Sequence, residues 1–94
     1  MRRITDRHLS QVVTQLNLDT RSPDTYGTKK DGGGLDIHIG HYHVDSAYGG
    51  NELVRTMNTG GGIEVISRGG YIPKRELYYQ ISALLDGIYI GAEV

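Results

Sequence analysis

Apolar and polar residues alternate in the run Leu35-Asp36-Ile37-His38-Ile39-Gly40-His41-Tyr42-His43-Val44-Asp45. A period of two is typical of a β-strand with one buried face, but the alternation breaks at Gly40. A bulge at Gly40 and His41 restores it. The buried face is then Leu35, Ile37, Ile39, Tyr42 and Val44, and the other face is Asp36, His38, His43 and Asp45. Without the bulge both His41 and His43 would enter the core and need polar partners, so we expect a bulged strand with His41 out of line with His43.

Glycine-rich turns on both sides of this run predict a small antiparallel sheet. Residues 46–50 form a turn, residues 52–58 return as a second strand, and Gly60-Gly61-Gly62 leads into a third over residues 63–67. The preceding segment, residues 19–34, is rich in Asp, Thr, Ser, Pro, Lys and Gly. It predicts a mobile surface loop, which is either a plain connector or a lid that closes over a ligand.

Helical patterns lie at the two ends of the chain. Thr5 can cap a helix over residues 6–17, because Leu9, Val12, Val13 and Leu16 follow one helical face. A second helix is expected over residues 73–86, with Pro73 in its first turn and Gly87 as its stop, followed by a short strand over residues 88–90. The prediction is one α+β domain over residues 1–94: an N-terminal helix, a three- or four-stranded antiparallel sheet and a C-terminal helix, with both helices on one sheet face.

The composition limits both the core and the partners. The chain has 94 residues with no Trp, Phe or Cys, so Ile, Leu, Val and seven Tyr must supply its core. A domain of this size has little stability to spare, which favours a homo-oligomer. The formal net charge of −1 disfavours general binding to nucleic acid. The start Met1-Arg2-Arg3 is followed by no apolar signal segment, and no apolar run is long enough for a membrane, so a cytoplasmic protein is expected.

Two histidines, two tyrosines and a carboxylate are crowded between Gly40 and Gly50. Aromatic and imidazole side chains beside bare backbone suit a small molecule or nucleotide, which makes His41, His43 and Tyr48 candidate ligand contacts. A zinc site needs three or four converging ligands, and the bulge separates the histidines, so no metal or other cofactor is expected. The chain has no cysteine and no serine in a nucleophile elbow, so binding is favoured over catalysis.

The run Arg68-Gly69-Gly70-Tyr71-Ile72-Pro73-Lys74-Arg75 predicts a site for a phosphate or carboxylate group. Pro73 places Ile72 at the start of the helix, and Ile72 has no side-chain oxygen to cap the first N–H groups. Those donors and the cations Arg68, Lys74 and Arg75 would receive an anion, with an aromatic base against Tyr48 or Tyr71. The alternative is that water or Glu76 satisfies the helix start.

Four motifs lie between Gly40 and Tyr78: Gly40-His41-Tyr42-His43, Ala47-Tyr48-Gly49-Gly50, Met57-Asn58-Thr59-Gly60-Gly61-Gly62 and Pro73-Lys74-Arg75-Glu76-Leu77-Tyr78. Together they resemble a group of small proteins encoded by tailed bacteriophages. The resemblance implies an accessory protein that acts in the host cytoplasm. Its implied role is to sequester a nucleotide-type immune signal of the host without cleaving it. The alternatives are a protein-binding inhibitor of a host defence enzyme and a small nucleic-acid-binding regulator.

Overall fold

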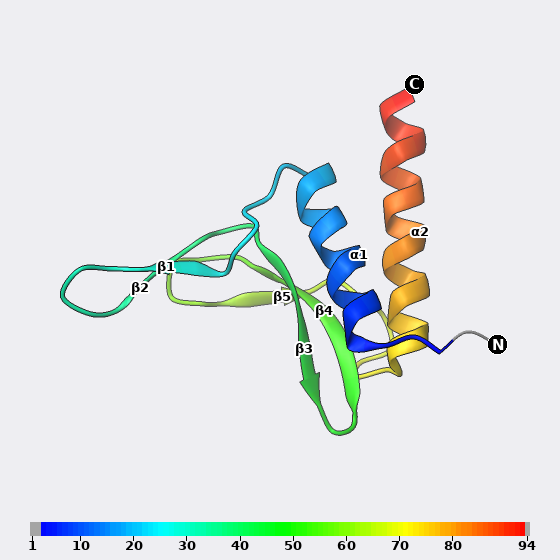
Figure 1. The fold of residues 1–94 in the computed structure, drawn as a ribbon, viewed down its shortest axis with the longest axis horizontal. Coiled ribbons are helices and arrows are strands. Elements are labelled where there is room, and N and C mark those ends of the chain that lie inside the picture. Colours follow the sequence, from blue (N-terminus) through cyan, green and yellow to red (C-terminus); the bar gives the residue numbers. More distant parts are fainter. Residues whose placement is uncertain (1–2, 94) are drawn as a thin grey trace.

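Two helices lie side by side against a three-stranded antiparallel sheet, and a two-stranded ribbon projects away from them (Figure 1). The computed structural model describes residues 3–93. The elements in chain order are α1 (Asp6–Asp19), β1 (Gly27–Lys29), β2 (Leu35–Ile37), β3 (Tyr42–Ala47), β4 (Gly50–Thr56), β5 (Ile63–Val65) and α2 (Lys74–Glu93). The α+β class predicted from the sequence is confirmed.

Helix α1 begins where the sequence predicted and ends two residues later. The Thr5 hydroxyl accepts a hydrogen bond from the His8 N–H at 3.4 Å, and His8 Nδ1 accepts one from the Thr5 N–H at 2.9 Å. This reciprocal capping satisfies backbone donors that the first turn leaves open. The buried residues are the predicted stripe with Asn17 added at its end: Leu9, Val12, Val13, Leu16 and Asn17. The apolar stripe therefore holds α1 against the core.

Helix α2 runs on to Glu93, so the predicted stop at Gly87 and the predicted strand over residues 88–90 are wrong. Leu77 and Ile81 are buried in the core, and Leu85 and Ile88 pack against it in part. Ile88 thus continues the helical stripe beyond Gly87, about one turn after Leu85. A glycine inside a helix costs only about 1 kcal/mol, which the contacts of Ile88 and the added helical hydrogen bonds offset.

The three-stranded sheet has the order β3-β4-β5. A two-residue turn joins β3 to β4, and both of its residues have positive φ, 54° at Tyr48 and 74° at Gly49. Such turns match the twist of a β-hairpin. Tyr42 and Leu53 belong to the core, to which the helices also contribute. Alternation places His43 and Asp45 on the opposite face of β3, as predicted.

The bulged strand that the sequence predicted over residues 35–45 is wrong. Strand β2 ends at Ile37 and pairs with β1, whereas β3 starts a separate sheet at Tyr42. The glycines at positions 32–34, all with positive φ, fold the chain back so that β2 finds its partner locally. The ribbon has no helix over it, so Leu35 and Ile39 are exposed rather than buried. The segment predicted as loop therefore contains β1.

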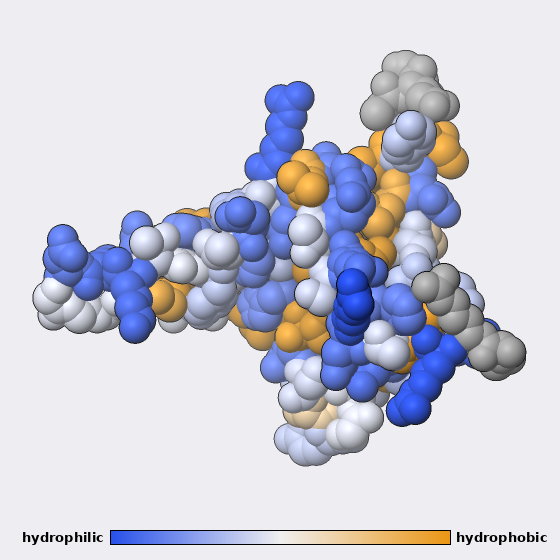
Figure 2. Space-filling view, in the orientation of Figure 1, coloured by the Kyte–Doolittle hydropathy of each residue, from blue (hydrophilic) through white to orange (hydrophobic). Residues whose placement is uncertain are grey.

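The surface of the helices and the surface of the projecting ribbon differ in polarity. Figure 2 shows apolar residues gathered along the helices, while the projecting ribbon is covered mainly by polar and neutral residues. The buried apolar core agrees with this difference, because it lies between the helices and the three-stranded sheet.

Candidate functional site

A groove of about 540 Å³ opens where both helices begin. Helices α1 and α2 run in the same direction, so their N-terminal ends lie together (Figure 1). The groove is lined by Arg3, Ile4, Thr5, Asp6, Gly49, Asn51, Pro73 and Lys74. The positive ends of two helix dipoles are thus directed towards one open space, which favours an anionic ligand.

The first turn of α2 supplies free hydrogen-bond donors to this groove. The first bond of the helix runs from the Leu77 N–H to the Pro73 carbonyl at 3.0 Å. Within residues 3–93, no side chain or backbone group accepts from the N–H groups of residues 74–76. Such donors are satisfied by solvent or by a ligand, because a helix start cannot satisfy them internally.

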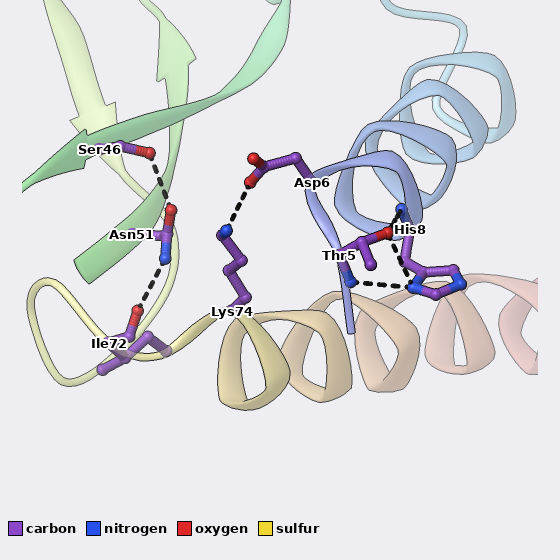
Figure 3. Close-up of polar contacts among 7 residues, drawn as sticks. All are labelled: Thr5, Asp6, His8, Ser46, Asn51, Ile72 and Lys74. Carbon is purple, nitrogen blue, oxygen red and sulfur yellow. Dashed lines mark hydrogen bonds and ion pairs between the residues drawn. The ribbon is translucent and has the colours of Figure 1, made fainter. Parts of the chain in front are cut away.

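Two cations and one carboxylate lie around the groove. Lys74 Nζ is 3.1 Å from Asp6 Oδ1, which ties the start of α2 to the start of α1 (Figure 3). Arg3 adds the second cation. The lining keeps an excess of one positive charge, although Asp6 opposes an incoming anion. The site is therefore suited to a phosphate that can draw Lys74 away from its carboxylate partner.

An aromatic pair stands beside the groove at the tip of the β3–β4 hairpin. Tyr48 is 96% exposed, and its ring meets the Tyr71 ring edge to face with a centroid distance of 5.6 Å. The Tyr71 hydroxyl donates to Asp45 Oδ2 at 2.6 Å, and this bond, with Glu52 nearby, raises the pKa of Tyr71 to about 12. Tyr71 is thus fixed in place, while Tyr48 next to the groove residue Gly49 offers a free ring face for stacking.

Asn51 holds the start of α2 against β4. Its side-chain amide donates to the Ile72 carbonyl at 3.2 Å and accepts from the Ser46 hydroxyl at 2.8 Å (Figure 3). The Asn51 and Ile72 backbones also exchange two bonds of 2.8 and 2.9 Å. Gly50 permits this approach, since a Cβ there would lie 2.6 Å from the Tyr71 backbone. The loop ahead of Lys74 is therefore anchored by three hydrogen bonds between Asn51 and Ile72.

The structure brings together three of the seven predicted ligand contacts: Tyr48, Tyr71 and Lys74. The Arg75 guanidinium lies over the Tyr79 ring at 5.6 Å, directed along α2. Arg68 pairs its backbone with the Gln80 side chain and lines a different groove. Arg3 and Asn51 were missed by the sequence reasoning. Asn51 does not stand out in the sequence, because its strand also carries Glu52, Arg55 and Thr56.

His41 and His43 lie at the other end of β3. Contrary to the prediction that His41 is out of line, the two rings stack with a centroid distance of 5.6 Å. The reason is that both belong to one face of the chain once no bulge intervenes. The His41 Nδ1–H donates to the Pro23 carbonyl at 2.8 Å, and the Tyr26 ring packs edge-on against His43 at 5.5 Å. The pair thus fastens the segment before β1 to the sheet.

The surroundings of His43 favour its neutral imidazole. Burial lowers the pKa of His43 first, the neighbouring His41 lowers it further, and Asp45 opposes both. His43 Nδ1 is buried without a hydrogen-bond partner among the described residues. The part of the chain that the structure describes holds no cluster of three or more His, Cys, Asp or Glu side chains placed to bind a metal ion.

Within the described residues, neither α1 nor α2 is long and apolar enough to cross a membrane. No protein-family model, curated protein or solved structure matches this chain.

Proposed function

We propose that this protein binds and retains a small phosphate-bearing ligand of the nucleotide type, without converting it. The observation that carries the proposal is the groove at the joint start of α1 and α2, with its uncapped N–H groups, Lys74 and the neighbouring Tyr48. The phosphate would take the donors of residues 74–76, with Lys74 and Arg3 as counter-ions. The base would stack on Tyr48, whose ring is almost fully exposed.

The lining of the groove supports binding rather than catalysis. Its eight described residues include no His, Cys or Glu, and its one carboxylate, Asp6, is paired with Lys74. A general base or nucleophile would have to be activated by a neighbour within hydrogen-bonding reach. The Thr5 hydroxyl is engaged at the cap of α1. The groove therefore offers recognition groups for an anion but no activated group to attack it.

The resemblance to small tailed-bacteriophage proteins supplies the biological setting of the proposal. A stoichiometric binder in the host cytoplasm would lower the free concentration of a nucleotide immune signal and so delay the response that it triggers. A homo-oligomer stays part of this proposal, because Leu84, Tyr89 and Ile90 are exposed along the second half of α2. Light scattering over a dilution series should report a dimer or larger assembly, and a monomer mass throughout would contradict it.

The experiment incubates the purified protein with a panel of cyclic dinucleotides and cyclic ADP-ribose, then heats it and identifies the released compound by mass spectrometry. Intact release is the expected result. Altered ligand would show catalysis, and no retained ligand from the panel would overturn the proposal.

Variants locate the ligand within the molecule. Lys74→Met should weaken binding, whereas Asp6→Asn should strengthen it by removing the carboxylate that competes for Lys74. Lys29→Met, on the ribbon, is the matched control for loss of a cation. Tyr48→Ala should also weaken binding, with the exposed Tyr89→Ala as its control. If Lys74→Met and Lys29→Met bind alike, the groove is the wrong site.

A further inference from the structure

The outer edge of β3 carries backbone groups that nothing in the described chain uses. Strand β3 lies at the edge of its sheet. Alternate residues of an antiparallel edge strand direct their N–H and C=O groups away from the sheet. The N–H and C=O groups of Tyr42 both bond to the Asn17 side chain, so they point away from the sheet. By alternation, the N–H and C=O groups of Val44 and Ser46 point away from the sheet as well. Within residues 3–93 no partner is found for their N–H and C=O groups.

Asn17 shows what this edge can bind. Its amide donates to the Tyr42 carbonyl at 3.0 Å and accepts from the Tyr42 N–H at 2.9 Å. An amide that makes both bonds to one residue reproduces the pairing of a neighbouring strand. The first position of the edge is therefore occupied by a strand mimic from α1, and the next two positions are free.

A groove of about 370 Å³ runs along the same edge. Asp6, Ser10 and Thr14 of α1 form one side, and Tyr42, Val44 and Ser46 of β3 form the other. Asn17 closes the groove at the Tyr42 end, and Asp6 lies beside Ser46 at the other end. A helix that flanks an open strand edge leaves room for one extended segment, which is the geometry in which added strands are bound.

The charge of the groove restricts the occupant. Asp6 and Asp24 are its charged residues, and no Lys or Arg stands among the described residues that line it. Asp24 makes no hydrogen bond or ion pair in the part of the chain that is described. Strand β3 also has no Lys or Pro, the residues that commonly protect an exposed edge from pairing.

We propose that the groove between α1 and the free edge of β3 binds an extended segment of a partner polypeptide as an added strand, and that this segment carries a cationic side chain. The backbone of Val44 and Ser46 supplies the hydrogen bonds, and Asp24 pairs with the cation. This docking surface is distinct from the phosphate groove and does not depend on it, although the two meet at Asp6 and Asn51.

The test uses Ser46→Pro, with Ser46→Ala as its matched control. Both substitutions remove the hydroxyl that bonds Asn51, but only proline removes the outward N–H. Proline is tolerated at such an edge position because that N–H takes no part in the β3–β4 ladder. Random dodecapeptides displayed on phage are selected against the parent protein, and the enriched peptides are synthesised and measured by calorimetry.

The expected result is enrichment of peptides with Lys or Arg that bind the parent and Ser46→Ala alike and bind Ser46→Pro roughly tenfold more weakly or worse, as expected for one lost hydrogen bond. Asp24→Asn should weaken them several-fold, and amide exchange at Val44 and Ser46 should slow when peptide is added. The proposal is overturned if no peptide is enriched, or if the enriched peptides bind Ser46→Pro as well as Ser46→Ala. Concentration-dependent protection of both amides without peptide would also overturn it, because a second copy would then occupy the edge.

Discussion

Replacement of Asn17 by alanine should destabilise the domain more than its polar character suggests. Asn17 is 3% exposed and Tyr42 is 8% exposed, so the two hydrogen bonds between them lie in the interior. Loss of the amide leaves the Tyr42 N–H and C=O without partners, at about 1–3 kcal/mol each for a buried group. Alanine returns up to about 0.7 kcal/mol through its higher helix propensity. Water from the adjoining groove relieves part of the penalty, so we expect a net loss of about 2–4 kcal/mol.

Urea unfolding followed by circular dichroism measures this loss, and hydrogen exchange at the Tyr42 amide reports its location. Thr14→Ala is the matched control, because Thr14 lies on the same helix and its hydroxyl bonds only the Ser10 carbonyl one turn earlier. The control should change stability by less than about 0.5 kcal/mol. If Asn17→Ala costs less than about 1 kcal/mol and leaves Tyr42 exchange unchanged, then the amide is no structural tie between α1 and β3.

Three further predictions concern stability. Ile81→Ala should cost about 2–5 kcal/mol in urea unfolding because Ile81 is fully buried, whereas substitution of the exposed Leu84 by alanine should cost much less. Equal losses would mean that α2 faces the core differently. Because the pKa of His43 is lowered from 6.5 in the fold, its neutral form stabilises the domain above that value, and unfolding midpoints should fall as the pH drops below it. His43→Gln should flatten this pH dependence, and an unchanged slope would contradict the assignment. Gly50→Ala should lower the melting temperature, since its Cβ would meet the Tyr71 backbone at 2.6 Å, and a normal melting curve would show that the loop can move aside.

The helices could be predicted because their signals are local. The Thr5 cap and the stripe from Leu9 to Leu16 lie within a few turns of one another, and α1 was placed to within two residues. The end of α2 was missed because Gly87 was taken as a stop, whereas Ile88 packs on the core through contacts that only the folded chain makes. A glycine is a weak local signal, and tertiary contacts overrode it.

The sheet and the site depend on pairings between distant residues. Alternation through Ile37 and Ile39 gave no indication that β2 pairs with β1 rather than joining β3. The sequence pointed to the uncapped start of the second helix at Lys74, but the groove found there has α1 as its second wall, and no spacing in the sequence relates Asp6 to Lys74. The hydrogen bonds between the Asn17 side chain and the Tyr42 backbone, at the edge of β3, were missed for the same reason.

The parallel course of α1 and α2 has a consequence for the order of folding. Two helices that follow one another closely can pair as a hairpin, but here residues 20–73 separate them, and a loop of that length must close before they touch. The β3–β4 hairpin has the shortest connection in the domain, the turn at Tyr48 and Gly49. The hairpin is therefore expected to form early, and the helices to dock on it late. Substitutions in the turn should slow refolding, whereas substitutions between α1 and α2 should mainly accelerate unfolding.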